Sequence, residues 1–213
     1  PGRRHPMGPL TATTPKPLLA VQGKPLMQWP LESLARGGFD AVVVNTGWLG
    51  DQISSRFGTT AQLDGRHPVR LLYSHEGRGP GEALETAGGI ARALPQLDPV
   101  FWVVAGDVFA PDFVFSAAAY DSFIASDRLA HLWLVPNPSH NPRRDFGLSD
   151  PGLGANLPAD DPRPRWTFST IGLYRRALFE APWCDIAPGN PEGRRAPLAP
   201  LLRAAMDAGR VGA

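Results

Sequence analysis

Four short, mainly apolar runs, each with a polar residue at its end or within two residues of it, constrain the fold of this 213-residue chain more than any other feature. The runs are Ala41–Asn45, Val69–Tyr73, Val100–Ala105 and Ala130–Val135. Segments with a helical spacing of apolar residues separate these runs, and the connections are short. Strands that alternate with helices in this way predict βαβ units. We therefore predict an α/β fold, in which helices flank a Rossmann-like, mostly parallel sheet.

Periodicity and stop signals predict the remaining elements. Apolar residues recur with helical spacing over Lys24–Arg36, where Pro25 suits a first turn and Gly37-Gly38 a stop. Further helices are predicted over Leu49–Phe57, Ala83–Leu94, Pro111–Ser126 and Leu198–Ala208, and a further strand over Arg165–Tyr174. The length and the hydrophobic content of 43% predict one globular domain over residues 1–213.

Composition excludes several classes of protein. The net charge of +1 lacks the basic excess of a nucleic-acid-binding protein. The apolar runs are far too short to span a bilayer, and the basic start at Pro1–Met7 leads into no apolar stretch that would make a signal peptide. The single cysteine, Cys184, excludes an internal disulfide and fits a reducing compartment. We therefore expect a cytoplasmic protein that binds neither nucleic acid nor membrane.

Polar residues stand just past the ends of four predicted strands. They are Asn45, Ser74, Asp107 and Asn137. Ligands of parallel sheets bind beyond the carboxyl ends of the strands, so these side chains are expected at one rim of the sheet. Turn formation is the alternative for the two asparagines, above all for Asn137 between Pro136 and Pro138.

Lys16 stands between two prolines, Pro15 and Pro17. Each proline fixes its own φ and favours an extended conformation for the residue before it. We therefore expect Lys16 outside any helix, with its ammonium presented from a stiff loop. An ammonium is a compact charge that suits phosphate, and the alternative is an ordinary solvated lysine.

Two acidic residues are candidates for substrate binding. Asp107, one residue after Gly106 at a strand end, can bind Mg²⁺, which takes one or two protein carboxylates and completes its shell with waters and phosphates. The alternatives for Asp107 are an Asx turn and a helix cap. Glu85 begins the segment Glu85–Gly89, whose small residues leave backbone N–H groups open to an anion. The Glu85 carboxylate can accept hydrogen bonds from sugar hydroxyls. A first-turn glutamate favoured by the helix dipole is the alternative for Glu85.

The chain resembles the sugar-1-phosphate nucleotidyltransferases, and most of all a branch that recycles cell-wall sugars. The resemblance rests on PLTATTPKPLLAVQGKPLMQWPLESL, followed in family order by VVVNTGWLGDQI, LETAGGI, VVAGDVF, LVPNPSHNPRRDFGL and TFSTIGLY. It implies transfer of a nucleotidyl group, here uridylyl, from a nucleoside triphosphate to a sugar-1-phosphate with release of pyrophosphate.

The resemblance also implies roles for particular residues. Gly2, Arg3 and Lys16 correspond to the nucleotide-binding loop, with Lys16 on the phosphates. Asp107 corresponds to the Mg²⁺ ligand, which with Lys16 makes the catalytic pair. The positions that correspond to sugar-phosphate contacts are Asn45, Glu85, Gly89, Asn137 and Thr170.

Departures from the family pattern lead to a second hypothesis. Pro6 occupies the position of the family's loop arginine, for which Arg3 or Arg4 is a candidate substitute. The family's first strand and its C-terminal aspartate, a second metal ligand, have no counterpart here, so we expect a chain truncated at both ends. A short insertion covers roughly Gly77–Ala83. The alternative function is a weak or inactive fragment, or a regulatory protein that binds nucleotide-sugar. The base, the sugar and the oligomeric state stay open.

Overall fold

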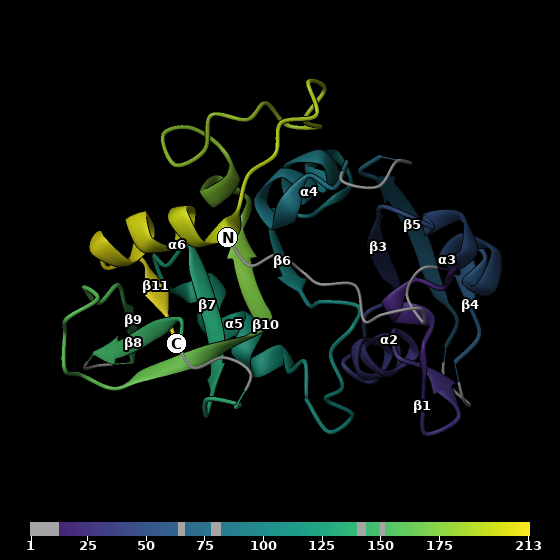
Figure 1. Cartoon of the computed structure of the whole chain (residues 1–213), viewed down its shortest axis with the longest axis horizontal. Helices are drawn as coiled ribbons and strands as arrows, with labels where there is room; N and C mark the ends of the chain where they lie inside the picture. The colour runs from purple at the N-terminus through teal and green to yellow at the C-terminus, as the bar shows by residue number, and fades with distance from the viewer. Residues whose placement is uncertain (1–12, 64–66, 78–81, 140–143, 150–151) are drawn as a thin grey trace. The chain divides into compact units, whose positions relative to one another are not determined.

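The computed structural model of the chain describes residues 13–63, 67–77, 82–139, 144–149 and 152–213. The chain divides into two compact units, which Figure 1 shows with their helices and strands labelled. Unit 1 comprises residues 1–84 and 106–116, and unit 2 comprises residues 85–105 and 117–213. The single domain over residues 1–213 stays a prediction, as do the absent first strand and the truncated end.

Unit 1 is built on a parallel pair of strands, β3 (Ala41–Thr46) and β5 (Val69–His75). The short strand β4 (Thr60–Ala61) pairs antiparallel with the other edge of β5. The helices α2 (Gln28–Arg36) and α3 (Gly50–Phe57) belong to the same unit. Its core consists of Met27, Leu31, Val44, Ile53, Ala61, Leu63, Val69 and Leu71. The β-branched and leucine runs of the sequence therefore form the strands that they predict, and Val44, Val69 and Leu71 of these strands belong to the core.

A small hairpin precedes α2 and was not expected. Its strands are β1 (Ala20–Val21) and β2 (Lys24–Pro25), and Gln22 and Gly23 between them have φ of 50° and 80°. Two consecutive positive φ values are typical of the tight hairpin turn whose twist matches the flanking strands. The helix predicted from Lys24 therefore begins only at Gln28, because Lys24 and Pro25 are committed to the hairpin.

Unit 2 contains a six-stranded sheet in the order β6-β10-β7-β11-β9-β8. The strands are β6 (Val100–Val103), β7 (Ala130–Val135), β8 (Phe146–Ser149), β9 (Leu153–Ala155), β10 (Arg165–Arg175) and β11 (Val211–Gly212). The long strand β10 lies between β6 and β7 and is antiparallel to both. β6 and β7 therefore run in the same direction without being neighbours. The α/β class is confirmed, but "mostly parallel" is wrong for the strand pairs of this sheet, because β10 separates strands that the sequence suggested would be adjacent.

The helices of unit 2 are α4 (Glu85–Ala93), α5 (Ala117–Ala125) and α6 (Leu198–Asp207), with 3-10 turns η2 (Leu94–Gln96) and η3 (Arg176–Phe179). The buried core includes Leu94, Leu132, Tyr174, Leu178, Phe179, Leu202 and Val211. Burial raises the pKa of the Tyr174 phenol, whose oxygen has no partner among the described residues. The helix predicted over residues 111–126 begins only at Ala117, because residues 106–116 belong to unit 1. Within the described residues, no helix has the length and apolar composition needed to cross a membrane.

The guanidinium of Arg175, at the end of β10, binds carbonyls of the last turn of α5 and of the residues just after it. Its Nη2 atom donates to the carbonyls of Phe123, Ile124 and Ser126 at 2.7–3.0 Å, and its Nε atom donates to that of Arg128 at 2.8 Å. The last carbonyls of a helix lack partners within the helix and carry its negative dipole end. Arg175 therefore fastens α5 to the sheet of unit 2.

We predict that Arg175→Ala lowers the free energy of unfolding by about 2–3 kcal/mol, because several carbonyls lose a charged donor together. Urea unfolding monitored by circular dichroism measures this change. Arg163→Ala is the control: Arg163 pairs with Asp161 in an exposed contact at 2.7 Å, and its loss should leave the urea midpoint unchanged. Equal effects of the two substitutions would contradict the role given to Arg175.

Candidate active site

Lys16 begins a single 3-10 turn, η1 (Lys16–Leu18). Pro15 is extended, with φ of −66°, but the N–H of Leu18 donates to the Pro15 carbonyl at 2.9 Å and that of Leu19 to the Lys16 carbonyl at 3.0 Å. The prediction that Lys16 lies outside any helix is therefore wrong, because Pro17 fits within a turn this short. The Lys16 side chain is half-buried, and no described residue accepts a hydrogen bond from its ammonium or pairs with it.

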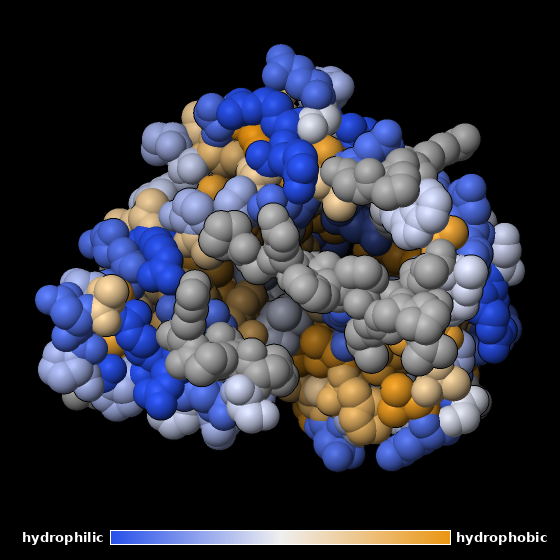
Figure 2. Space-filling view, in the orientation of Figure 1, coloured by the Kyte–Doolittle hydropathy of each residue, from blue (hydrophilic) through white to orange (hydrophobic). Residues whose placement is uncertain are grey.

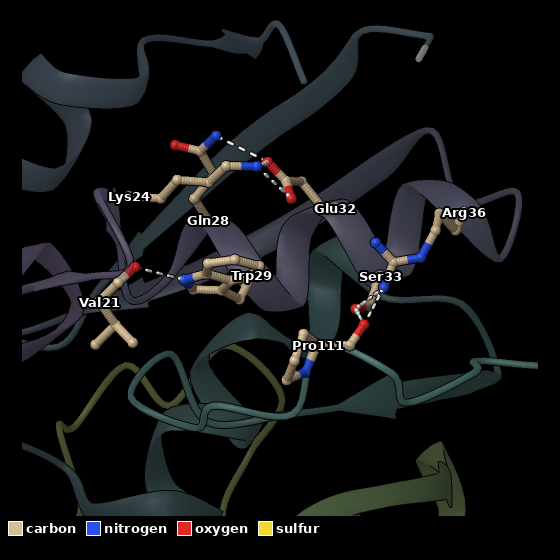
Figure 3. Close-up of polar contacts among 8 residues, drawn as sticks. All are labelled: Val21, Lys24, Gln28, Trp29, Glu32, Ser33, Arg36 and Pro111. Atoms are coloured by element: carbon tan, nitrogen blue, oxygen red, sulfur yellow. Dashed lines mark hydrogen bonds and ion pairs between the residues drawn. The ribbon is translucent and has the colours of Figure 1, made fainter. Parts of the chain in front are cut away.

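The second lysine of this region, Lys24, has a structural role. Figure 3 shows its ammonium on both carboxylate oxygens of Glu32, at 2.9 and 3.1 Å, with Gln28 donating to the same carboxylate at 2.8 Å. Glu32 is only 7% exposed, so its charge needs these donors. Trp29 contributes twice, since its ring lies 5.1 Å from the Lys24 ammonium and its Nε1 atom donates to the Val21 carbonyl. Lys24 therefore joins the hairpin to α2.

Asp107 lies on a loop that packs against the loop of Lys16. A Cβ atom placed on Gly106 would lie 3.6 Å from Pro17 and from Met27, and the Met27 N–H donates to the Pro17 carbonyl at 2.9 Å. Asp107 itself is exposed, and its carboxylate has no partner in the described part of the chain. The distances from a Cβ atom on Gly106 to Pro17 and Met27 are ordinary van der Waals distances, so the packing here does not require a glycine at position 106. Gly106 and Pro17, the chain neighbours of Asp107 and Lys16, thus lie close together within unit 1.

The segment after Asp107 is attached to α2 by aromatic and polar contacts. Phe109, 43% exposed, stands edge-on to Trp29 with 5.2 Å between ring centroids. Figure 2 shows apolar residues gathered over β1 and α2 in this part of unit 1. The Arg36 guanidinium donates to the Ser33 hydroxyl and to the Pro111 carbonyl, as Figure 3 shows. The loop that carries Asp107 therefore rests on the helix that follows the Lys16 turn.

A hollow of about 480 Å³ lies between α2 and residues 111–115, and sequence reasoning missed it. Its lining consists of Trp29, Ser33, Arg36, Gly37, Pro111, Asp112, Phe113, Val114 and Phe115. A Cβ atom on Gly37 would lie 2.6 Å from the Phe115 carbonyl oxygen, so this glycine permits a close approach as well as ending the helix. None of the predicted site residues lines the hollow.

The carboxyl ends of β3 and β5 bring polar side chains side by side. The strand register pairs Asn45 with Ser74 and Thr46 with His75, as the parallel arrangement predicts. Asn45 is exposed, whereas Ser74 is 4% exposed and its hydroxyl has no partner among the described residues. The Thr46 hydroxyl lies 2.7 Å from Nδ1 of His75. Asn45 is thus available for a ligand, while Thr46 and His75 satisfy each other.

In unit 2, the entry to α4 is partly closed by backbone. The N–H groups of Ala87 and Gly88 both donate to the Ala196 carbonyl, at 3.0 and 3.1 Å. The prediction that backbone N–H groups here stay open to an anion is therefore wrong for these two. Glu85 is exposed and has φ of 60°, and its carboxylate lies 3.5 Å from the Arg195 guanidinium. Gly89 is buried within the helix.

A buried asparagine holds the loop opposite α4. Asn190 is fully buried, and its carboxamide donates to the Gly88 and Arg194 carbonyls at 3.1 and 2.8 Å and accepts from the Arg194 N–H at 2.8 Å. The Asn190 carbonyl accepts a further bond from Arg92 at 3.2 Å. Nothing in the sequence singled out this residue, since asparagine in a Gly-Asn-Pro stretch is typical of an ordinary turn.

Asn137 and Thr170 behave differently from each other. The Asn137 amide donates to the Arg165 carbonyl at 2.9 Å, and its oxygen accepts from the Thr167 hydroxyl at 3.1 Å, so much of its bonding capacity is used by β10. Thr170 has φ of 70° at an irregularity of β10, and its hydroxyl has no partner among the described residues. A β-branched residue with positive φ is strained, and such strain is concentrated at functional sites.

The remaining predicted features concern the nucleotide loop and the metal. Gly2, Arg3 and Pro6 lie outside the described residues, as do residues 78–81 of the insertion. Among the described residues, no three acidic, histidine or cysteine side chains gather as a ready-made metal site. A lone, exposed and unpaired carboxylate such as Asp107 nevertheless suits Mg²⁺ held mainly by phosphates and water.

The sequence is similar to those of known proteins, and this similarity identifies its family. The model of the nucleotidyl transferase family matches residues 2–155. This chain belongs to the nucleotidyl transferase family. An N-acetylmuramate alpha-1-phosphate uridylyltransferase from Neisseria meningitidis is 44% identical over 218 aligned positions, which cover 99% of this chain and 84% of the relative. The resemblance predicted from the sequence is confirmed.

Other relatives of this nucleotidyltransferase cover less of it or share only the fold. A UTP–glucose-1-phosphate uridylyltransferase from Synechocystis is 39% identical over 46% of this chain and 26% of the relative. The structure of apo UDP-glucose pyrophosphorylase matches with a TM-score of 0.68 at 14% identity, over 97% of this chain and 84% of that chain. An inositol-1-phosphate CTP transferase from T. maritima matches with a TM-score of 0.64 at 15% identity, over 95% and 78%. The fold is therefore that of the nucleotidyltransferases.

We predict that Thr170→Gly raises the free energy of unfolding by about 1 kcal/mol. Relief of backbone strain, about 1–3 kcal/mol, exceeds the added chain entropy of glycine, about 0.5–1 kcal/mol. Thermal unfolding measures the change. Thr170→Ala removes the hydroxyl but keeps the Cβ atom at the same φ, and it should recover little of the gain. A glycine variant less stable than the alanine variant would show that Thr170 is not strained.

Proposed function

We propose that this nucleotidyltransferase transfers a uridylyl group from UTP to N-acetylmuramate 1-phosphate, in the recycling of cell-wall sugars in the cytoplasm. The similarity to the Neisseria relative, which extends over 99% of the chain, carries the proposal. The unpaired Lys16 and Asp107 on contacting loops of unit 1 support it. These are the charges that a triphosphate and its cation require.

The reaction needs no protein nucleophile. A phosphate oxygen of the sugar 1-phosphate attacks the α-phosphorus of UTP, the bond from this phosphorus to the bridging oxygen of the β-phosphate breaks, and pyrophosphate leaves. Catalysis of this kind depends on positioning and on stabilising the charge that develops on the phosphate oxygens. A side chain with an uncommitted positive charge, held on a rigid turn, provides that stabilisation.

Lys16 is assigned to the phosphates of UTP, with Gly2 and Arg3 of the nucleotide loop. Asp107 would hold Mg²⁺, which when bound neutralises phosphate charge. Asn45, Glu85, Gly89, Asn137 and Thr170 are assigned to the sugar phosphate. Asn137 retains one N–H and one lone pair beyond its two contacts with β10, and the Glu85 carboxylate is exposed, so both have capacity for substrate.

Pro6, in place of an arginine, favours a second candidate function, a protein that binds nucleotide or nucleotide-sugar without turnover. Release of pyrophosphate from UTP, Mg²⁺ and N-acetylmuramate 1-phosphate distinguishes the two. Turnover at the rates typical of enzymes is expected. Calorimetric binding of the nucleotide without any turnover would instead support the binding protein.

We predict that Lys16→Ala lowers kcat/KM about 100-fold or more, because charge stabilisation at the phosphates is lost, and leaves the melting temperature unchanged. Lys24→Ala is the matched control. It leaves the buried Glu32 without its cation and should cost about 3 kcal/mol of stability. A coupled pyrophosphate assay and thermal unfolding measure both effects. Loss of stability in the Lys16 variant would assign that lysine to structure.

Asp107→Asn is expected to lower kcat about 100-fold and to raise the Mg²⁺ concentration needed for half-maximal rate, because the carboxylate is the assigned ligand. Magnesium titration of the pyrophosphate assay measures this. Asp112→Asn, five residues further along the same segment, is the control and should leave the magnesium dependence unchanged. If both variants showed the same magnesium dependence, Asp107 would not be the Mg²⁺ ligand.

A further inference from the structure

The hollow of about 480 Å³ between α2 and residues 111–115 is lined by none of the residues assigned to the reaction. Its volume lies within the range of about 300–1,000 Å³ that is typical of small-molecule sites. All of its lining belongs to unit 1. Phe115 in this lining is 1% exposed, whereas Val114 beside it is 70% exposed. The hollow therefore joins a buried aromatic wall to an apolar rim in contact with solvent.

Contacts within unit 1 hold the walls of the hollow in place. The hydroxyl of Ser33, a buried residue of α2, donates to the Pro111 carbonyl at 3.4 Å. The N–H of Phe113 donates to the Ala110 carbonyl at 3.1 Å, which closes a turn in the facing segment. The rings of Phe113 and Phe115 meet edge to face, with 4.8 Å between their centroids. The hollow is therefore formed before any ligand enters, as small-molecule sites usually are.

Two opposite charges line the hollow, those of Arg36 and Asp112, and no ion pair joins these two described residues. The Nη2 atom of Arg36 donates to the Ser33 hydroxyl and to the Pro111 carbonyl, which fixes the guanidinium at the wall (Figure 3). The Nε and Nη1 atoms of Arg36 donate to no acceptor in the described part of the chain. The exposed carboxylate of Asp112 likewise has no partner there. One cation and one anion of the hollow are thus left for a ligand.

From these two open charges beside aromatic rings we infer that the hollow binds a zwitterionic amino acid with an apolar side chain. The carboxylate of the amino acid accepts from Arg36, and its ammonium pairs with Asp112. Its side chain packs on the rings of Trp29 and Phe113. A ligand with a single charge would leave either the guanidinium or the carboxylate of the hollow without a partner. This site is separate from the proposed reaction, because none of the residues assigned to the substrates lines it.

Three probes that share a phenyl group test the inference. They are phenylalanine, phenethylamine, which lacks the carboxylate, and phenylpropanoate, which lacks the ammonium. Nuclear magnetic resonance of isotopically labelled protein follows binding through the indole N–H signal of Trp29, which the Trp29→Phe variant identifies. Phenylalanine should shift this signal saturably with a Kd in the millimolar range, as the small size of the ligand predicts. Each probe with one charge should bind about 5- to 20-fold more weakly, the range for one charged pair at a partly exposed site.

Substitutions assign the two charges. Asp112→Asn should lower the affinity for phenylalanine to that for phenylpropanoate, and it tests the site without disturbing the fold because Asp112 has no partner among the described residues. Arg36→Gln should lower the affinity for phenylalanine to that for phenethylamine. Asp51→Asn, which removes an exposed carboxylate of α3 outside the hollow, is the matched control and should keep the full preference for phenylalanine.

Two results would overturn the inference outright. They are the absence of a saturable shift of the Trp29 signal with phenylalanine, and equal affinities of the Asp112→Asn variant and the wild type for phenylalanine. Binding of phenethylamine as tight as that of phenylalanine would also overturn it, and would indicate that the hollow accepts a basic side chain of a partner protein instead.

Discussion

A buried carboxylate in α2, that of Glu32, is the constraint that fixes the β1–β2 hairpin against this helix in unit 1. Lys24 and Gln28 donate to the carboxylate of Glu32, which is 7% exposed, and an unpaired charge at that depth costs several kcal/mol. The bond from Lys24 fastens the hairpin of β1 and β2 to the helix, and the Met27 N–H fastens Pro17 to the same place. Two lysines with similar sequence surroundings therefore do different things. Lys24 completes the fold, whereas the ammonium of Lys16 has no partner among the described residues.

The corresponding constraint in unit 2 is backbone pairing at the entry to α4. The Ala196 carbonyl occupies two of the N–H groups that a phosphate or sugar would otherwise use. The charged side chains exposed at this entry are those of Glu85 and Arg195, which pair at 3.5 Å.

The sequence predicts the continuous apolar strands well, since β7 has the predicted bounds and β3 differs by one residue. A short, continuous apolar run rich in β-branched residues has few alternatives to a strand. The short strands β8, β9 and β11 were missed because each contains glycine and spans only a few residues. The place of β10 between β6 and β7 is set by pairing between distant strands, and the local periodicity of the sequence does not predict which strands pair.

In the candidate site, too, some features follow from local sequence and others depend on the tertiary structure. The strand-end position of Asp107 follows from the general position of ligands in parallel sheets, so the sequence could suggest it, and its role stays a prediction. The positive φ of Thr170 could not be predicted, because the sequence around it is that of an ordinary strand.

The buried Asn190 gives an irregular segment the rigidity of an element of secondary structure. Residues 180–197 contain no helix or strand, yet the Gly189 N–H donates to the Ala91 carbonyl and the Arg194 N–H to the Asn190 side chain. Amide protons tied in this way leave only when the surrounding core opens. Deuterium uptake in this stretch should therefore be as slow as in α4, and a connection that looks loose in outline would behave as part of the framework.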